Sequence, residues 1–192
     1  MVITGDHGMT KVGNHGGNTR DETHTALLLI STNKSHVHPS GYKPKIDIDR
    51  SVLQIDIAPT LAALYAFPLP SKSQGRIMSS VLERFDVPDT EHLCLLFQNA
   101  FHVQRLIIRA DKKYQRKLKM LLIDGLSYHY VHAYHQRDVR PEEHRYNYER
   151  SRNMYQKFIL AVQQQYVKRA TNRSLFSSLT GLIAASHLII AA

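Results

Sequence analysis

The sequence predicts an α/β fold that is followed by helices and then by the start of a membrane-spanning segment. Short apolar runs alternate with polar loops in residues 1–88, and apolar side chains recur at helical spacing in residues 89–173. Residues 174–192 contain no Asp, Glu, Lys or Arg. These three observations divide the chain into three segments, residues 1–88, 89–173 and 174–192.

The first segment begins with a predicted strand at residues 2–4, which leads directly into a glycine-rich loop. A strand that feeds a functional loop so close to the first residue favours a fragment of a longer domain. Residues 26–31 are apolar on both faces, as buried parallel strands are. A polar loop at residues 32–50 follows this second predicted strand.

A helix is predicted over residues 57–64. Asp56 is a good helix cap, and Pro59 falls within the first turn, where its missing N–H is tolerated. Pro68 and Pro70 end the helix. We interpret Asp56 as a cap rather than a catalytic acid, and Thr60 and Ser31 as structural, because neither hydroxyl has a base near it in sequence.

The second segment reads as one long helix over residues 90–123 and another over 149–170. An apolar stripe runs along the first, and basic residues crowd its far end, where a negative helix terminus favours cations. Residues 124–148 are rich in His and Tyr without a clear period. The basic stretch from Arg105 to Lys119 is predicted to form a solvated helix face, and binding to the phosphates of RNA or of lipid head groups is the alternative. Its cations include Lys112, Lys113, Arg116, Lys117 and Lys119.

As a helix, residues 174–192 would extend about 28 Å, which is close to the thickness of a bilayer core. We therefore predict a truncated transmembrane helix there, although a buried terminal helix is the competing interpretation. Lys168, Arg169 and Arg173 would favour a cytosolic location for the residues that precede the span.

The composition limits the chemistry. The single cysteine, Cys94, excludes an internal disulfide and a cysteine-based zinc site. The formal charge of +9 is compatible with nucleic acid, an acidic membrane or an anionic substrate. No nucleic-acid-binding motif accompanies the basic stretches, so we expect no nucleic-acid partner.

The strongest chemical signal lies in the first loop, where an adjacent aspartate and histidine are followed eight residues later by a second histidine. Asp6, His7 and His15 offer carboxylate oxygen and imidazole nitrogen, both of which are zinc ligands. Flanking glycines let the backbone approach a ligand closely. A turn without metal is the alternative, and three ligands cannot complete two metal sites. The three candidate ligands lie in the segments Gly5-Asp6-His7-Gly8-Met9 and Asn14-His15-Gly16-Gly17.

This loop resembles the metal loop of the alkaline phosphatase superfamily. The ordered segments that follow resemble, more narrowly, the GPI ethanolamine phosphate transferases, most of all type 2, which modifies the second mannose, and then type 3. These segments are Glu22-Thr23, Ala26-Leu27-Leu28-Leu29-Ile30-Ser31, Gln54-Ile55-Asp56-Ile57-Ala58-Pro59-Thr60-Leu61, Phe67-Pro68-Leu69-Pro70 and Gly75. Residues 1–88 would then be the C-terminal part of an alkaline-phosphatase-like catalytic domain.

The resemblance implies phosphoethanolamine transfer from phosphatidylethanolamine to a mannose of the GPI precursor. Asp6 and His7 would bind one zinc ion and His15 a second. The resemblance places a threonine nucleophile and the remaining ligands in an N-terminal half that this chain lacks, so we expect the chain to be inactive alone. It also implies a multi-pass protein of the endoplasmic reticulum membrane, a lumenal catalytic domain and a small membrane-protein subunit.

Two other functions are compatible with the sequence: a soluble metal-dependent phosphodiesterase or pyrophosphatase, and a non-catalytic basic interaction fragment. His129, His132, His135 and His144 lack a carboxylate partner and a regular spacing, so we predict a polar surface there rather than a metal site. Asn33 begins a sequon in a polar loop and is a candidate for glycosylation in a lumen.

Overall fold

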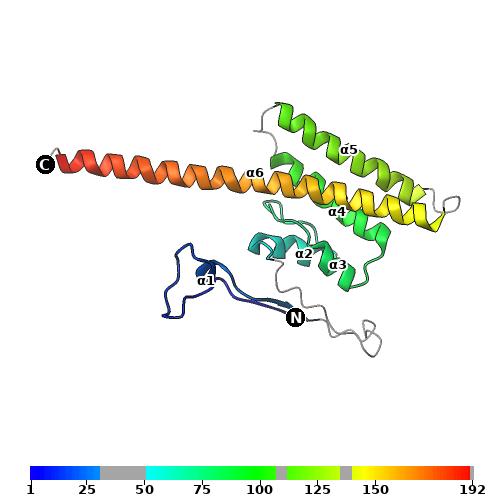
Figure 1. Cartoon of the computed structure of the whole chain (residues 1–192), viewed down its shortest axis with the longest axis horizontal. Coiled ribbons are helices and arrows are strands. Elements are labelled where there is room, and N and C mark those ends of the chain that lie inside the picture. Colours follow the sequence, from blue (N-terminus) through cyan, green and yellow to red (C-terminus); the bar gives the residue numbers. More distant parts are fainter. Residues whose placement is uncertain (31–50, 107–111, 135–139, 191–192) are drawn as a thin grey trace. The chain divides into compact units, whose positions relative to one another are not determined.

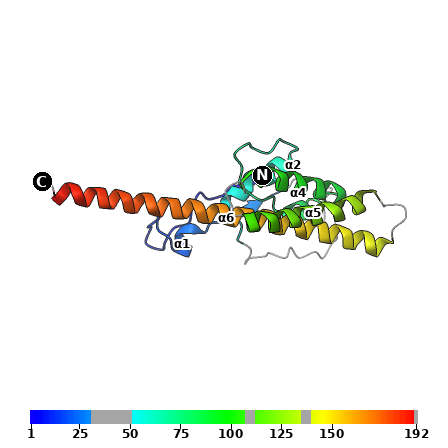
Figure 2. The same cartoon turned by 90° about the horizontal axis from the view of Figure 1, so that it is seen from above.

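The structure, a computed structural model, describes residues 1–30, 51–106, 112–134 and 140–190, with side chains described as far as residue 168. The chain divides into two compact units, Met1–Val52 and Leu53–Ala192. Helices predominate in the described residues, and a small two-stranded sheet lies in the first unit (Figures 1 and 2).

Both predicted strands of the first unit are confirmed. Strand β1 (Val2–Thr4) pairs with β2 (Leu27–Leu29), and Ile3 lies opposite Leu28. The pairing is antiparallel and Leu28 is 51% exposed, so the prediction of a buried parallel strand is wrong. A parallel strand is buried when helices cover both faces of its sheet, whereas the only described helix of this unit, α1 (Arg20–Thr23), has four residues. The described residues do not display an alkaline-phosphatase-like fold directly.

The second unit begins with a 3-10 turn, η2 (Gln54–Asp56), which leads into α2 (Ile57–Leu64). The predicted helix over residues 57–64 is therefore confirmed. Asp56 occupies the N-cap position, but its side chain makes no capping hydrogen bond. Its interpretation as a side-chain cap is wrong, and the physical reason lies in its tertiary contacts.

Asp56 is fully buried and joins segments that are distant in sequence. Its Oδ1 accepts hydrogen bonds from the Arg76 backbone N–H at 2.8 Å and from Gln163 Nε2 at 2.7 Å. The structural role predicted for Thr60 is confirmed, because its hydroxyl donates to the Asp56 carbonyl and accepts from the Met78 N–H. Ser31 lies outside the described residues.

The single helix predicted over residues 90–123 is instead two helices, α4 (Asp89–Gln104) and α5 (Lys112–Tyr134). Both pack against a third helix, α6 (Pro141–Ile190). The prediction of one continuous helix is wrong because α4 and α5 each pack separately against α6. The basic cluster of residues 112–119 therefore lies at the start of α5 and not, as predicted, at the end of a longer helix.

The core of the second unit forms where α4, α5 and α6 meet, next to the short helix α3 (Ser79–Arg84). The helix predicted over residues 149–170 is confirmed as part of α6, while α5 and the start of α6 extend into residues 124–148, where no period was predicted. That region lacks an apolar period because polar residues occupy its inner face. The buried core residues are Ile77, Leu82, Leu96, Ala100, Val103, Leu118, Tyr155, Phe158, Ile159 and Val162.

No helix in the described part of the chain is both long and apolar enough to cross a membrane. The backbone of α6 continues to Ile190, shown in red in Figure 1. The transmembrane helix predicted at residues 174–192 falls where side chains are not described, so it stays a prediction. The predicted glycosylation site, Asn33, also lies outside the described residues.

Candidate functional site

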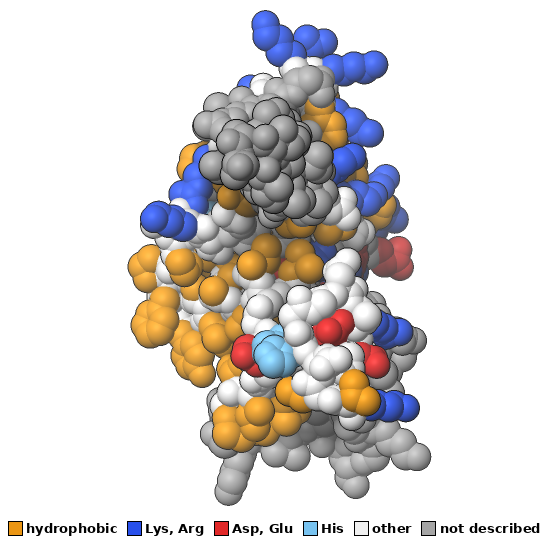
Figure 3. All heavy atoms as spheres, turned by 90° about the vertical axis from the view of Figure 1, so that its left-hand side faces the viewer, with side chains coloured by type: hydrophobic (Ala, Val, Ile, Leu, Met, Phe, Trp, Pro, Cys, Tyr) orange, Lys and Arg blue, Asp and Glu red, His pale blue; other side chains and the backbone are white. Residues whose placement is uncertain are grey.

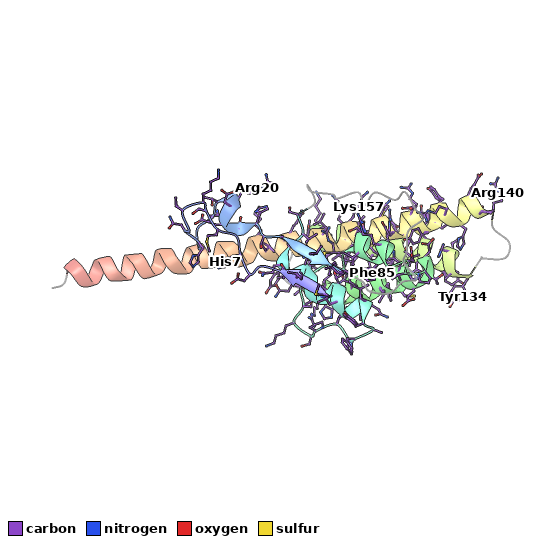
Figure 4. All side chains as sticks on the ribbon, turned by 90° about the horizontal axis from the view of Figure 1, so that it is seen from below. His7, Arg20, Phe85, Tyr134, Arg140 and Lys157 are labelled. Carbon is purple, nitrogen blue, oxygen red and sulfur yellow. The ribbon has the colours of Figure 1, made fainter. Side chains whose placement is uncertain are left out.

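The loop after β1 carries Asp6 and His7, and both are exposed (Figure 4). Asp6 Oδ1 accepts a hydrogen bond from the His7 backbone N–H at 3.0 Å, while Asp6 Oδ2 lies 3.6 Å from His7 Nε2. A carboxylate oxygen and an imidazole nitrogen thus lie side by side at the surface. Figure 3 shows histidine side chains, in pale blue, next to an acidic side chain on this face.

His15 lies against His7, although seven residues separate them in the chain. The two rings stack with 4.9 Å between their centroids and 5° between their planes. A tight turn returns the chain between them: the Thr10 N–H donates to the Asn14 carbonyl, and the Gly13 N–H donates to the Thr10 carbonyl, both at 2.9 Å. Gly13 has a φ of 87°, which glycine adopts without strain. The structure therefore places His7 next to Asp6 on one side and next to His15 on the other.

Glu22, on α1, holds the chain that follows His15. Its buried carboxylate accepts hydrogen bonds from the Thr19 hydroxyl at 2.5 Å, the Thr19 N–H at 3.2 Å and the Gly17 N–H at 3.2 Å. The hydrogen bond from the Thr19 hydroxyl, more than any other contact, lowers the pKa of Glu22. Sequence reasoning missed this role, although a threonine three residues before a glutamate is the signature of a capping box.

Replacing Glu22 with glutamine should loosen the loop that carries His15, because an amide accepts these three hydrogen bonds more weakly than a carboxylate does. We expect faster hydrogen exchange at the Gly17 and Thr19 amides. Asp21→Asn, on the exposed neighbour, is the matched control and should leave both exchange rates unchanged. Equal rates in wild type and Glu22→Gln would show that this carboxylate does not order the loop.

The donor chemistry of this loop suits a divalent ion in part. His7 Nδ1 lies 2.7 Å from the Gly8 carbonyl oxygen, so in the neutral ring Nδ1 carries the proton and Nε2 keeps its lone pair. Metal-binding histidines have the same arrangement. Across the described ranges, however, no group of three or more His, Cys, Asp or Glu side chains is placed to hold a metal ion. The loop thus gathers the predicted ligands without forming a complete site.

The histidine-rich region of the second unit is not the polar surface that was predicted. His132 is fully buried, and its ring centroid lies 3.9 Å from that of His144. His132 Nδ1 lies 3.2 Å from the His144 carbonyl, and His129 Nδ1 lies 3.1 Å from the Tyr155 hydroxyl. These side chains pack between α5 and α6. His135 lies outside the described residues.

His92, on α4, is buried in the same region, and sequence reasoning missed it. Its Nε2 lies 2.8 Å from the Ser79 hydroxyl and its Nδ1 lies 2.9 Å from the Tyr148 hydroxyl. A neutral imidazole donates from one nitrogen and accepts at the other, and two hydroxyls satisfy both. Its place four residues before Leu96, on the apolar face of α4, is the sequence signal for burial. Burial, and secondarily the Arg152 guanidinium, lowers the pKa of His92 to about 4.

Acid should therefore destabilise the second unit. Because the pKa of His92 is lower in the folded state, the unfolded chain binds more protons between its ordinary pKa near 6.5 and about pH 4. The free energy of unfolding should fall across this window as the pH falls, by up to about 3 kcal/mol. Burial lowers the pKa of His132 as well, and it contributes in the same direction.

Urea unfolding at a series of pH values measures this slope. His92→Gln removes the titrating group while retaining a hydrogen-bond donor and an acceptor. The free energy of unfolding of this variant should therefore depend less steeply on pH than that of the wild type. An unchanged slope in that variant would assign the acid sensitivity to other groups.

Comparison with known proteins identifies relatives of the chain. It is 38% identical over 108 residues to GPI ethanolamine phosphate transferase 2 of Candida albicans, covering 55% of this chain and 12% of that protein. It is 35% identical over 115 residues to the protein of the same name in Schizosaccharomyces pombe, covering 55% of this chain and 14% of the relative. The human GPI ethanolamine phosphate transferase 2, catalytic subunit, is 32% identical over 116 residues, covering 60% of this chain and 11% of its own length.

No protein-family model matches the chain, and no solved structure gives a significant match. The sequence relatives nevertheless define a class, the phosphoethanolamine transferases of GPI-anchor biosynthesis. The chain is similar to GPI ethanolamine phosphate transferase 2 of fungi and human, which confirms the resemblance found in its motifs. The chain spans between a tenth and a seventh of the length of these relatives.

Proposed function

We propose that this chain contributes part of the catalytic domain of an enzyme that transfers phosphoethanolamine from phosphatidylethanolamine to a mannose of the GPI precursor. The observation that carries the proposal is its identity of 32–38% to relatives bearing that enzyme's name in both fungi and human. The meeting of Asp6, His7 and His15 in one loop supports it, because these are the residues that the family resemblance assigns to metal binding.

We propose that Asp6 and His7 hold one zinc ion and that His15 holds a second. The two imidazole planes are nearly parallel and stacked, which favours one ion for each ring, since an imidazole binds a metal close to its own plane. Two bound divalent ions would stabilise the attacking and leaving oxygens of a transferred phosphoryl group. The remaining ligands and a threonine nucleophile would come from the part of the relatives that this chain does not span.

The chain's own residues have definite tasks in this scheme. Asp6 would balance positive charge, and Gly8 would fix the tautomer of His7 through its carbonyl. Glu22 would keep His15 in place by ordering the segment after it. Both histidines must be neutral to bind zinc, so transfer should decline in acid.

The same proposal places the complete protein in the endoplasmic reticulum membrane with its catalytic domain in the lumen. Its partners there would be the GPI precursor, phosphatidylethanolamine and a small membrane-protein subunit. The comparisons support this setting only through the names of the relatives, which are enzymes of GPI-anchor assembly.

A chimera tests the function. Residues 1–106 replace the corresponding segment of GPI ethanolamine phosphate transferase 2 in Saccharomyces cerevisiae cells that lack their own copy. We expect restored ethanolamine phosphate on a mannose of the GPI glycan, read by mass spectrometry, which also shows which mannose is modified. A chimera that reaches the membrane in normal amounts but adds no ethanolamine phosphate would overturn the proposal.

The chimera also separates the alternatives. A soluble phosphodiesterase or pyrophosphatase would hydrolyse nucleotide diesters without modifying the glycan. A non-catalytic fragment would leave both assays negative and hold no zinc even within the chimera.

A further inference from the structure

The outward face of α5 is apolar over its second half. The inward face carries the buried residues Leu118, Gly125 and His132, which are seven positions apart. On the opposite side, at helical spacing, Met120, Ile123, Tyr130 and Tyr134 are 53%, 56%, 57% and 74% exposed. Leu126 flanks this stripe and is 45% exposed. Apart from the exposed Ser127 between Ile123 and Tyr130, this stripe is apolar, and exposed apolar patches mark surfaces that contact a partner or a membrane.

The first half of the same helix is basic. Its first two turns carry five exposed cations, Lys112, Lys113, Arg116, Lys117 and Lys119. Among the described residues, Lys112, Arg116, Lys117 and Lys119 form no ion pair. The positive end of a helix dipole repels cations in the first turn, so an anion next to Lys112 would stabilise the start of this helix.

The basic cluster and the apolar stripe share one face. Arg116, Met120 and Ile123 follow one another at intervals of four and three residues, and Tyr130 and Tyr134 continue the row. We name this row and the cations beside it, residues 112–134, the α5 ridge. Figure 3 shows Lys and Arg side chains at the top of the view, the side on which Figure 1 shows α5.

We propose that the α5 ridge docks on an anionic membrane surface. The cations would lie among lipid phosphates, Met120 and Ile123 would enter the boundary of the acyl chains, and Tyr130 and Tyr134 would lie at the polar interface. Long lysine stems allow the ammonium groups to stay in the headgroup layer while their methylenes cover apolar surface.

The composition of the ridge favours lipid over an acidic protein. Interfaces between proteins are enriched in arginine and depleted in lysine, whereas four of the five cations here are lysine. A lysine ammonium is a compact charge that needs no bidentate partner, and a fluid layer of headgroups offers none. The lysine-rich cluster of the α5 ridge is thus better suited to a layer of anionic lipid headgroups than to an acidic protein.

Flotation of the full chain with lipid vesicles tests the proposal. We expect binding to vesicles of phosphatidylcholine and phosphatidylserine, and much weaker binding to phosphatidylcholine alone. The combined variant Lys112→Glu, Lys117→Glu and Lys119→Glu should lower the partition coefficient by about a hundredfold, because each cation near such a surface contributes about a fivefold effect.

Matched controls carry the same changes at other exposed positions. The triple variant Lys72→Glu, Lys157→Glu and Lys168→Glu has an equal net charge but an intact ridge, and it should bind at least tenfold more strongly than the ridge variant (Figure 4 labels Lys157). Ile123→Asp should lower binding by about tenfold or more. Phe101→Asp, on an exposed residue of α4, should change it far less.

Circular dichroism confirms that each variant folds. Insertion of residues 174–192 would be common to all variants, so it would give binding that is insensitive both to lipid charge and to the ridge substitutions. That result, or no vesicle binding at all, would overturn the proposal. The assay contains neither zinc nor transfer substrates, so its outcome is independent of the proposed function.

Discussion

Replacing His15 with alanine in the yeast chimera should abolish addition of ethanolamine phosphate to the GPI glycan. Loss of an outer-shell partner of a bound metal typically lowers affinity or activity 10- to 100-fold, and loss of a ligand should exceed that. The stacking of the His15 ring on His7 at 4.9 Å gives this side chain the position from which a second ion could be held. Zinc content per chimera, measured by mass spectrometry of the metal, should fall in parallel with activity.

His24→Ala is the matched control for this prediction. His24 is an exposed histidine of the same unit that no motif assigns to metal binding, and its Nδ1 lies 3.1 Å from the Thr23 hydroxyl. We expect normal transfer and normal zinc content in this variant. Retained transfer in His15→Ala, or an equal loss in His24→Ala, would contradict the role given to His15.

The local parts of the fold could be predicted from the sequence because their causes are local. The helix at residues 57–64 follows from its proline in the first turn and the breakers after it. The two strands follow from short apolar runs bounded by glycine and polar residues. Their antiparallel pairing could not be predicted, because an apolar run alone does not say which partner it will find.

The helical unit shows where sequence reasoning fails. The stripe of α4 was correctly identified, but α4 and α5 are separate helices that both pack on α6, and this packing is a tertiary cause. Asp56 was misread for the same reason. Its hydrogen-bond partners, Arg76 and Gln163, are 20 and 107 residues away.

The candidate site was more predictable than the fold around it. Asp6 and His7 are neighbours in sequence, and the glycine-rich turn after them brings His15 back within a few residues. The hydrogen-bond partners of the buried histidines were not predictable from spacing, because those partners belong to other helices. His92, for example, lies between Ser79 and the distant Tyr148.

Asn99→Ala should strongly destabilise the second unit. The Asn99 side chain is fully buried, with Oδ1 accepting from the Ile77 N–H at 3.0 Å and Nδ2 donating to the Gly75 carbonyl at 3.1 Å. Alanine would leave both backbone groups buried without a partner. Each such group costs about 1–3 kcal/mol, so we expect a loss of about 2–5 kcal/mol in the free energy of unfolding.

Urea unfolding with an unchanged m-value would measure this loss, and the neighbouring exposed residue supplies the control. Gln98→Ala should change the free energy of unfolding by about 0.5 kcal/mol or less. The segment around Gly75, which Asn99 binds, is tightly packed: a Cβ atom on Gly75 would lie 1.9 Å from the Ile55 carbonyl oxygen. Equal stability of the two variants would mean that the hydrogen bonds of Asn99 add little to those that Asp56, Thr60 and Gln163 make with the same segment.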